Sequence, residues 1–320
     1  MPLTLDDLYS SPDHYLHSFD AERAIFVPMD RSAYHRSIFL DARISAAAGQ
    51  PMGLAVEVLA QAVRAPLPTS WIFHMAHVGS TLLARALDDR DASLVLREPL
   101  ALRQLALQPD QQRLAIVAAM VGKRYRADAP TLVKANVPVN FLLPKLAGIG
   151  PNAPAILLYL PLRDYLLAIL RNKSHRDWLG NVTSFLSNHL GDLSALTDAE
   201  RGAALWLAQV DAFTAALRAL PNARALNAEL FFAEPEAVVN AAANHLGVPI
   251  ALAAIKATVA GPLFSTHAKD PALPFDNAQR VGRRHELERA MAAELERAQE
   301  WLAQRADAPD AALEAAALEI

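Results

Sequence analysis

Short apolar segments alternate with amphipathic segments through the middle of the chain. The apolar segments lie at 71–73, 93–96, 131–133, 155–160 and 224–232, and their lengths predict buried strands. Between them the apolar side chains recur at helical spacing, as in residues 111–121 and in residues 197–220, which begin with a capping box. Strands that alternate with helices in this way predict a parallel sheet with helices on both faces.

The first of these strands leads into the clearest chemical motif. A short loop, His74 to Gly79, follows the strand, and Ser80 and Thr81 then begin a predicted helix. The first N–H groups of a helix lack backbone partners and carry partial positive charge, so an anion of the phosphate or sulfate type binds there. The two hydroxyl groups add donors, and Gly79 lets the backbone approach the anion. The segment therefore predicts a phosphate-binding loop.

This loop departs from the nucleotide triphosphatase pattern G-x-x-x-x-G-K-[ST]. Aligned on that pattern, His74 replaces the first glycine and Ser80 replaces the lysine, whereas Gly79 and Thr81 match. Without the lysine, the loop lacks the cation that reaches the β- and γ-phosphates. The loop is therefore not typical of ordinary ATP or GTP hydrolysis.

Residues 76–82, AHVGSTL, resemble the 5′-phosphosulfate loop of sulfotransferases that use 3′-phosphoadenosine 5′-phosphosulfate (PAPS), with His77 at the position of their basic residue. Residues 134–138 resemble the lysine–threonine–histidine segment of that family, with Asn136 in place of the histidine. Residues 226–235 resemble its strand and acidic turn before the last helices. The three likenesses follow the family order.

The resemblance implies an α/β fold: a three-layer α/β/α P-loop NTPase-like arrangement with a parallel sheet and helical N- and C-terminal additions. On this basis we predict a helical N-terminal extension (1–67), a nucleotide-binding core (68–250) and a C-terminal loop and helix that close over the core (251–320). The implied activity is in-line, metal-independent transfer of a sulfuryl group from PAPS, the co-substrate, to a hydroxyl or amine of a small-molecule acceptor.

Three side chains are candidates for catalysis. Glu98 follows the second predicted strand, at the carboxyl end where open α/β sheets bind ligands, and it is the candidate general base. A surface ion pair with Arg97 or Arg103 is the structural alternative. His77 or Lys134 would offset negative charge on the bridging oxygen of the donor, while a lysine facing water at a strand end is the alternative for Lys134.

The candidate residues for binding PAPS lie in the loop and on four basic side chains. They are Ala76, His77, Val78, Gly79, Ser80, Thr81, Arg163, Arg171, Lys269 and Arg280. In the sulfotransferase family an arginine and a serine after the fourth strand hold the 3′-phosphate. Here the matching positions are Leu160 or Pro161 and Ala168, and Arg163 or Arg171 could substitute for them. The alternative is that each arginine only caps or flanks the helix.

Two segments are predicted as loops. A polar, turn-rich segment at 180–196 is predicted to be a lid or an acceptor-side segment. The loop at 261–275 precedes one amphipathic helix at 286–306. The family closes a late basic loop over the nucleotide, a role open to Lys269 and Arg280. The alternative is a basic helix start balanced by the acidic residues after it. The tail after residue 307 is expected to be frayed.

Composition narrows the class of protein. The 320 residues are 53% hydrophobic and 20% charged, which is typical of a globular chain. A formal net charge of −4 gives no broad basic surface, so we expect no nucleic-acid partner. Cysteine is absent, which excludes disulfides and thiolate chemistry and fits a reducing compartment. With no signal-like start and no apolar run of membrane-spanning length, we expect a cytoplasmic protein without a membrane partner.

Two other functions remain open. A magnesium-dependent P-loop kinase acting on a small molecule would use Thr81 as a metal ligand and Glu98 as the base. A non-catalytic nucleotide-binding homologue would carry His77 and Asn136 in place of lost catalytic groups. A magnesium requirement distinguishes the kinase, and nucleotide binding without turnover distinguishes the binding protein.

Overall fold

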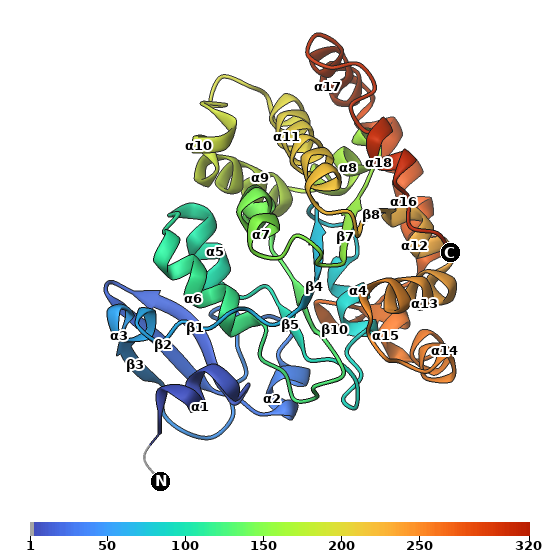
Figure 1. Ribbon diagram of the computed structural model, residues 1–320. Helices are drawn as coiled ribbons and strands as arrows, with labels where there is room; N and C mark the ends of the chain where they lie inside the picture. Colours follow the sequence, from blue (N-terminus) through green and yellow to red (C-terminus); the bar gives the residue numbers. More distant parts are fainter. Residues whose placement is uncertain (1–2) are drawn as a thin grey trace.

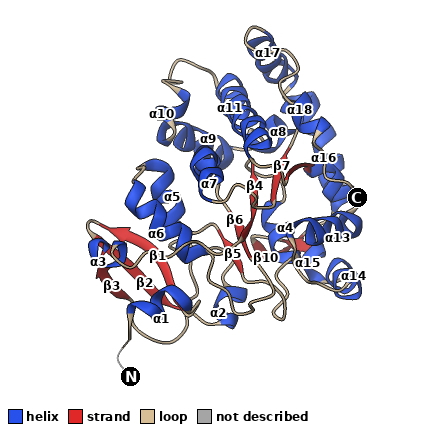
Figure 2. Cartoon of the chain, in the orientation of Figure 1, coloured by secondary structure: helices blue, strands red, loops and turns tan. Residues whose placement is uncertain are grey.

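A computed structural model describes residues 3–320. Its central strands are β4 (Thr69–His74), β5 (Val95–Arg97), β6 (Thr131–Lys134), β7 (Ala155–Tyr159) and β8 (Ala223–Asn227). They form one parallel sheet in the order β5-β6-β4-β7-β8 (Figures 1 and 2). All five predicted strands are present. The last is shorter than predicted because the Asn227 side chain accepts a hydrogen bond from the Glu229 N–H (2.9 Å) and so begins α12 (Ala228–Ala233).

Helices cover both faces of this sheet (Figure 1). One layer contains α7 (Leu143–Ile149), α8 (Leu162–Ile169), α9 (Lys173–Phe185) and α11 (Asp198–Ala219). The other contains α4 (Ser80–Ala86), α13 (Pro235–Leu246), α14 (Leu252–Ala260) and α15 (Pro262–Ser265). Strand β7 is apolar and buried throughout, as a strand covered on both faces must be. The three layers and the parallel sheet confirm the predicted fold class.

The strand order places the phosphate-binding loop at the centre of one sheet edge. From β4 the chain builds β5 and β6 on one side of the sheet, and it then crosses to build β7 and β8 on the other side. In open parallel sheets such a reversal opens a crevice at the carboxyl ends of the strands, where ligands bind. Here β4 ends at His74, and Glu98 and Lys134 stand at the ends of β5 and β6.

The N-terminal extension is not mostly helical, so that prediction is wrong. It contains a three-stranded antiparallel sheet of β1 (His14–Asp20), β2 (Arg23–Pro28) and β3 (Met52–Ala55), with short helices α1 (Leu5–Ser10), α2 (Arg31–Arg36) and α3 (Val56–Ala60). One edge of β1 is closed by a side chain. Gln104 on α5 (Leu100–Leu107) bonds to both the N–H and the carbonyl of Phe19, at 2.7 and 2.8 Å. The pairing of β2 with β3 and the Gln104 bonds join segments that are distant in sequence. The local spacing of apolar residues does not reveal such contacts.

The two segments predicted as loops also contain secondary structure. Residues 180–196 continue α9 and include α10 (Ser187–Leu190), and residues 261–275 include α15 and a hairpin of β9 (Thr266–His267) and β10 (Asp270–Pro274). The predicted helix at 286–306 is divided into α16 (Asn277–Ala290) and α17 (Ala292–Ala303). The remaining elements are α6 (Gln111–Val121), the 3₁₀ helix η1 (Val137–Leu142) and α18 (Ala311–Ala315).

The C-terminal tail is docked on the sheet, and the expectation of fraying is wrong. Leu313 is fully buried, and Leu318 is nearly so. The Ala225 N–H donates to the Ala316 carbonyl and the Leu318 N–H donates to the Ala225 carbonyl, both at 2.8 Å. The tail therefore covers the free edge of β8, which would otherwise expose unpaired backbone groups.

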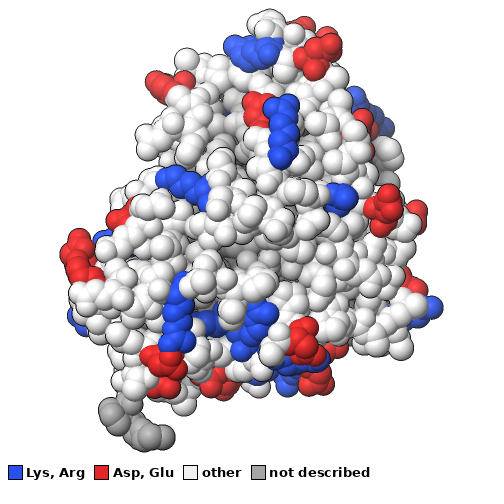
Figure 3. Space-filling model, in the orientation of Figure 1, with Lys and Arg blue, Asp and Glu red and all other residues white. Residues whose placement is uncertain are grey.

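Charges of both signs are scattered over the face seen in Figure 3, around a broad uncharged centre. This face shows no extended basic surface. Among residues 3–320, no helix has the length and apolar character needed to cross a bilayer.

Candidate functional site

The loop between β4 and α4 holds two residues in the left-handed region of backbone space. His77 has φ 61° and Gly79 has φ 76°; glycine adopts this region easily, whereas a bulky residue there is uncommon. A Cβ added at Gly79 would lie 2.8 Å from the ring of Phe232, so this glycine also lets the aromatic ring pack directly on the loop. Substitution of Gly79 would therefore disturb the loop in two ways.

The start of α4 has polar groups available for a ligand. No side chain caps the first turn of this helix, which Ser80 and Thr81 begin. The Thr81 hydroxyl is buried and has no hydrogen-bond partner within the described part of the chain. Buried hydroxyl groups are nearly always paired, so an unpaired one at a predicted phosphate-binding loop suggests that a ligand supplies the partner.

His77 lies against α9. This contact was not predicted from the sequence, because the C-terminal half of α9 was predicted as a lid or acceptor-side segment. The His77 ring stacks on that of His175, with centroids 4.0 Å apart, and meets Trp178 edge-on at 5.8 Å. Burial lowers the pKa of His77 to about 2, and the nearby Lys269, His175 and Arg171 act in the same direction. His77 is therefore neutral at pH 7, and positive charge at the loop comes from other side chains.

Glu98 and Lys134 meet at the ends of adjacent strands. Glu98 has φ 57°, and its N–H donates to the Lys134 carbonyl at 2.7 Å. The Lys134 ammonium is fully buried and donates to the Glu98 carboxylate. Desolvation raises the pKa of Glu98, but the charge of Lys134 and its hydrogen bond outweigh this, and the pKa lies below its usual value. Glu98 is therefore ionised at neutral pH.

The alternative partner Arg97 does not pair with Glu98. It is buried, pairs with Asp88 at 2.5 Å and donates to the backbone carbonyls of Tyr34 (2.6 Å) and Ser37 (3.0 Å). These bonds attach the N-terminal extension to β5. The alternative prediction of a surface ion pair between Glu98 and Arg97 is therefore wrong. Arg97 has a structural role.

The N-terminal extension reaches the site beside Glu98. The Leu40 N–H donates to the Arg97 carbonyl at 2.7 Å, and the Leu100 N–H donates to the Leu40 carbonyl at 3.3 Å. The neighbouring Phe39 ring lies 3.8 Å from the guanidinium of Arg43 and 5.6 Å from the ammonium of Lys134. Neither Phe39 nor Arg43 belongs to a motif, so neither could be placed at the site from the sequence.

Two of the basic residues predicted to bind PAPS lie at the loop. Arg171, at the end of α8, has its Nε 3.1 Å from Nδ1 of His175, and Lys269 lies in the turn of the β9–β10 hairpin. Arg85 on α4 holds this hairpin through a 2.8 Å hydrogen bond to the Ala268 carbonyl. Lys269 is exposed, yet desolvation by the surrounding protein lowers its pKa. In the part of the chain that the structure describes, neither Arg171 nor Lys269 has a carboxylate partner.

The other two predicted basic residues are engaged in ion pairs. Arg163 lies 3.2 Å from Glu288. Arg280 pairs with both carboxylate oxygens of Glu229, each at 2.8 Å, and stacks on Phe232 at 4.2 Å. These pairs join α16 to α8 and α12, which gives both arginines a structural role in this arrangement.

Asn136, predicted from the resemblance to replace a histidine, is buried, and its Oδ1 has no partner among the described residues. Residues 3–320 contain no group of three or more His, Asp or Glu side chains arranged to hold a metal ion.

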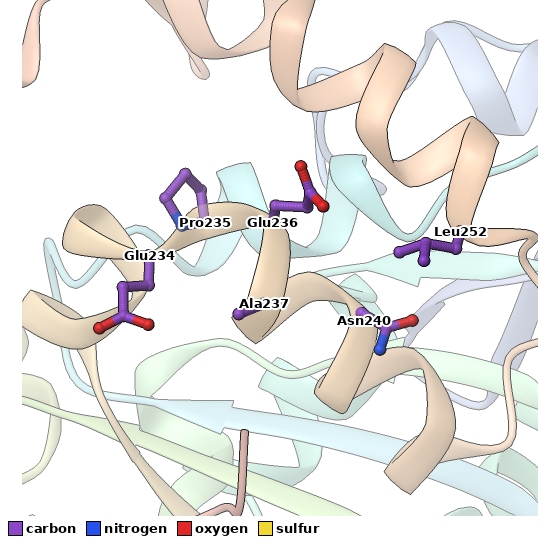
Figure 4. Close-up of a pocket in the computed structure, with 6 residues that line it drawn as sticks. All are labelled: Glu234, Pro235, Glu236, Ala237, Asn240 and Leu252. Atoms are coloured by element: carbon purple, nitrogen blue, oxygen red, sulfur yellow. The ribbon is translucent and has the colours of Figure 1, made fainter.

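A pocket of about 440 Å³ lies between α13 and α14 (Figure 4). Its lining residues are Glu234, Pro235, Glu236, Ala237, Asn240 and Leu252. The carboxylates of Glu234 and Glu236 point in different directions in Figure 4, and Lys256 lies 3.4 Å from Glu236. The pocket thus has no convergent set of polar groups, and we assign it no ligand.

No protein-family model matches this chain, and no curated protein matches it in sequence. Among solved structures it is similar to the sulfotransferase domain from the curacin biosynthetic pathway, with 11% identity, a TM-score of 0.39, and 66% of this chain and 84% of that chain covered. It is also similar to a sulfotransferase from Alicyclobacillus acidocaldarius, with 15% identity, a TM-score of 0.40, and 75% and 97% of the two chains covered.

Proposed function

We propose that the protein is a sulfotransferase-like enzyme that transfers a sulfuryl group from PAPS to a hydroxyl or amine of a small-molecule acceptor. One observation carries this proposal. The loop carries a buried hydroxyl with no partner among the described residues, and it lies near two cations from separate segments, Arg171 and Lys269, and near the carboxylate of Glu98. Transfer of an anionic group needs this combination, because cations stabilise the donor and leaving group while a base accepts a proton from the acceptor.

The residues at the loop fit an anionic group of the donor. The Thr81 hydroxyl and the first N–H groups of α4 are available as hydrogen-bond donors, and Lys269 supplies positive charge. Pro161 and Ala168, at the family positions for the 3′-phosphate, cannot bind a phosphate. We assign that role to Arg171 in preference to Arg163, because Arg163 is paired with Glu288.

The assignment of catalytic roles follows from the contacts of Glu98. PAPS supplies an activated sulfuryl group. Glu98 takes the acceptor proton while the acceptor atom bonds to sulfur and the bond between sulfur and the bridging phosphate oxygen breaks, which leaves the electron pair on that oxygen. Lys134 is buried against Glu98, so we assign it to keep the carboxylate ionised, and Lys269 to offset charge on the bridging oxygen. The transfer needs no metal in this scheme, since side-chain cations balance the charge.

Ligand binding tests the proposal directly. A ligand that binds only the folded state raises the melting temperature, so purified protein is titrated with adenosine 3′,5′-bisphosphate, AMP and magnesium–ATP. We expect stabilisation by the bisphosphate without metal, reduced in Thr81→Val and Arg171→Ala and retained in Arg163→Ala. A shift seen with magnesium–ATP alone contradicts the proposal and favours the kinase.

Turnover is the second readout. The protein is incubated with PAPS carrying a labelled sulfuryl group and a panel of hydroxyl and amine acceptors, and labelled product is measured. We expect transfer that Glu98→Gln abolishes while binding of the bisphosphate remains. Binding without transfer to any acceptor identifies a non-catalytic nucleotide-binding homologue.

A further inference from the structure

His74, the last residue of β4, lies buried beneath the loop between two backbone carbonyls. Its Nδ1 is 2.7 Å from the Met75 oxygen, and its Nε2 is 2.7 Å from the Ala135 oxygen. Its own carbonyl accepts a hydrogen bond from Asn140 at 3.0 Å, and Asn140 is held in turn by Gln209 at 3.1 Å. The ring therefore links the start of the loop to the end of β6, next to Lys134.

This geometry needs two hydrogen-bond donors on one imidazole. A carbonyl oxygen only accepts, and a neutral imidazole has a single N–H, so one of the two contacts sets a nitrogen lone pair against an oxygen lone pair. An imidazolium would donate to both carbonyls. The contacts of the ring thus favour its protonated form.

The charges around His74 oppose that form. Burial lowers the pKa of His74 to about 3, and Lys134 on β6 and Lys269 on the hairpin act in the same direction, while Glu98 at the end of β5 opposes them. The nearby His77 is itself neutral at pH 7. Without a bound anion the ring is therefore neutral, with one of its two carbonyl contacts unfavourable.

An anion at the loop would change this balance, because a nearby opposite charge favours the protonated imidazole. We propose that His74 takes up a proton when an anionic ligand binds at the loop, so that its ring donates to both carbonyls and fixes the loop against the end of β6. This inference rests on the proposed function only in requiring that the loop bind an anion. His74 is a positioning residue, since it acts through the loop and β6.

Binding and protonation are linked, so each must favour the other. The affinity for the anion therefore falls as pH rises, by up to about tenfold per pH unit where a whole proton is taken up. A residue with a merely structural role would leave this pH dependence unchanged. The pH dependence of the affinity therefore distinguishes a His74 that takes up a proton from a His74 that only supports the loop.

Calorimetric titration with adenosine 3′,5′-bisphosphate between pH 6 and 8, in buffers of different ionisation heat, counts the protons taken up. His74→Gln keeps an N–H donor but cannot be protonated. His245→Gln is the control, because His245 is a half-buried histidine that contacts a backbone carbonyl, that of Ala155, at the start of β7. We expect His74→Gln to take up fewer protons than the other proteins. His77→Gln tests the other histidine at the loop.

A measurement on the unaltered protein does not depend on how the variants fold. In protein labelled with ¹⁵N-histidine, both ring nitrogens of His74 should shift to imidazolium values when the bisphosphate is added. Binding without that shift, proton uptake unchanged in His74→Gln, or uptake lost only in His77→Gln would overturn the inference and leave the anion site intact. No binding at any pH would instead refute the proposed function, and the inference with it.

Discussion

The basic side chains around the loop and those along α16 differ in what they contact. Arg280 and Arg284 on α16 are paired with carboxylates of α8 and α12, Arg280 with Glu229 and Arg284 with both Asp164 and Glu229. Arg171 and Lys269 face the loop without such partners among the residues described. The two groups contain the same residue types and lie in the same half of the chain, so residue type alone does not distinguish them.

This difference indicates that a basic residue is a candidate for binding a ligand anion when it forms no ion pair with a carboxylate among the described residues. Unpaired cations that are crowded together repel one another, and desolvation adds to the cost, so such clusters mark sites where a ligand completes the charge balance. Paired cations on a surface helix are explained by the fold. The predictions below test this distinction.

Substitution of Glu98, the carboxylate proposed as the base, should have the largest effect. Glu98→Gln keeps the size of the side chain but removes the base, and we expect the rate of transfer to fall by about 10²–10⁴-fold. Glu229→Gln is the matched control, since Glu229 pairs with arginines of α16 away from the loop, and its rate should change by less than about threefold, as a surface ion pair contributes little. Steady-state kinetics checks both. Equal losses would remove the distinction between the two regions.

Lys123 provides a buried cation outside either region. It is 3% exposed, and its ammonium donates to the carbonyls of Leu8 (3.0 Å) and His14. Burial lowers the pKa of Lys123 to about 7. Between that value and its unfolded value of about 10.4 the unfolded chain binds a proton that the folded chain does not, so stability should rise with pH.

Lys123→Met tests this expectation. The rise in the free energy of unfolding from pH 7 to 10, on the order of 3 kcal/mol, should disappear in the variant, as measured by urea denaturation at each pH. His245→Gln should keep the rise. A rise that persists in Lys123→Met means that other groups produce it.

The arginine assigned to the 3′-phosphate should matter for binding more than its neighbour. Loss of a charged hydrogen bond costs about 1.5–3 kcal/mol, so Arg171→Ala should weaken binding of adenosine 3′,5′-bisphosphate by roughly 10–100-fold. Arg163→Ala removes an arginine of α8 that is already paired with Glu288, and it should change the dissociation constant by less than about twofold. Calorimetry measures both. A stronger effect of Arg163→Ala would reverse the assignment and show that its pair with Glu288 opens for the ligand.

Local sequence patterns predicted the core well because its signals are local. Strand β7 is a continuous apolar run, α11 begins at the Thr197 capping box, and α13 ends at Gly247 in a left-handed conformation. Those features depend on neighbouring residues. The loop before α4 was likewise visible from Gly79 and the two hydroxyl residues after it.

The surroundings of that loop were predicted only in part, since they come from distant segments. His175 and Trp178 reach His77 from a helix whose second half was predicted as a lid, and Phe39 arrives from an extension predicted as helical. The pairing of Glu98 with Lys134 depends on β5 and β6 being neighbours in the sheet, which periodicity does not specify. The ion-pair partners of basic residues were predicted least well. Arg163 and Arg280 were predicted to bind PAPS, but they pair with Glu288 and Glu229.

The smallest effect should come from the ion pairs of α16. This helix has no buried residue, and its ion pairs with α8 and α12 are exposed or half-exposed, so salt screens them. Arg280→Ala should lower the free energy of unfolding by at most about 1 kcal/mol, and by less in high salt, as measured by thermal denaturation with and without added sodium chloride. Arg305→Ala, a surface arginine that stacks on Trp301 and forms no ion pair within residues 3–320, controls for loss of a stacked guanidinium.

Arg280→Ala also tests whether the ion pairs of α16 are independent of the phosphate-binding loop. Arg280 lies over Phe232, and Phe232 packs where a side chain of Gly79 would stand, so α16 contacts the loop indirectly through Phe232. If Arg280 is only structural, its loss leaves the dissociation constant of the bisphosphate within about twofold, since a surface ion pair contributes little. A larger loss in Arg280→Ala, with the effect absent in Arg305→Ala, would mean that a paired cation supports the loop through Phe232. The contrast would then be one of distance from the ligand rather than of pairing.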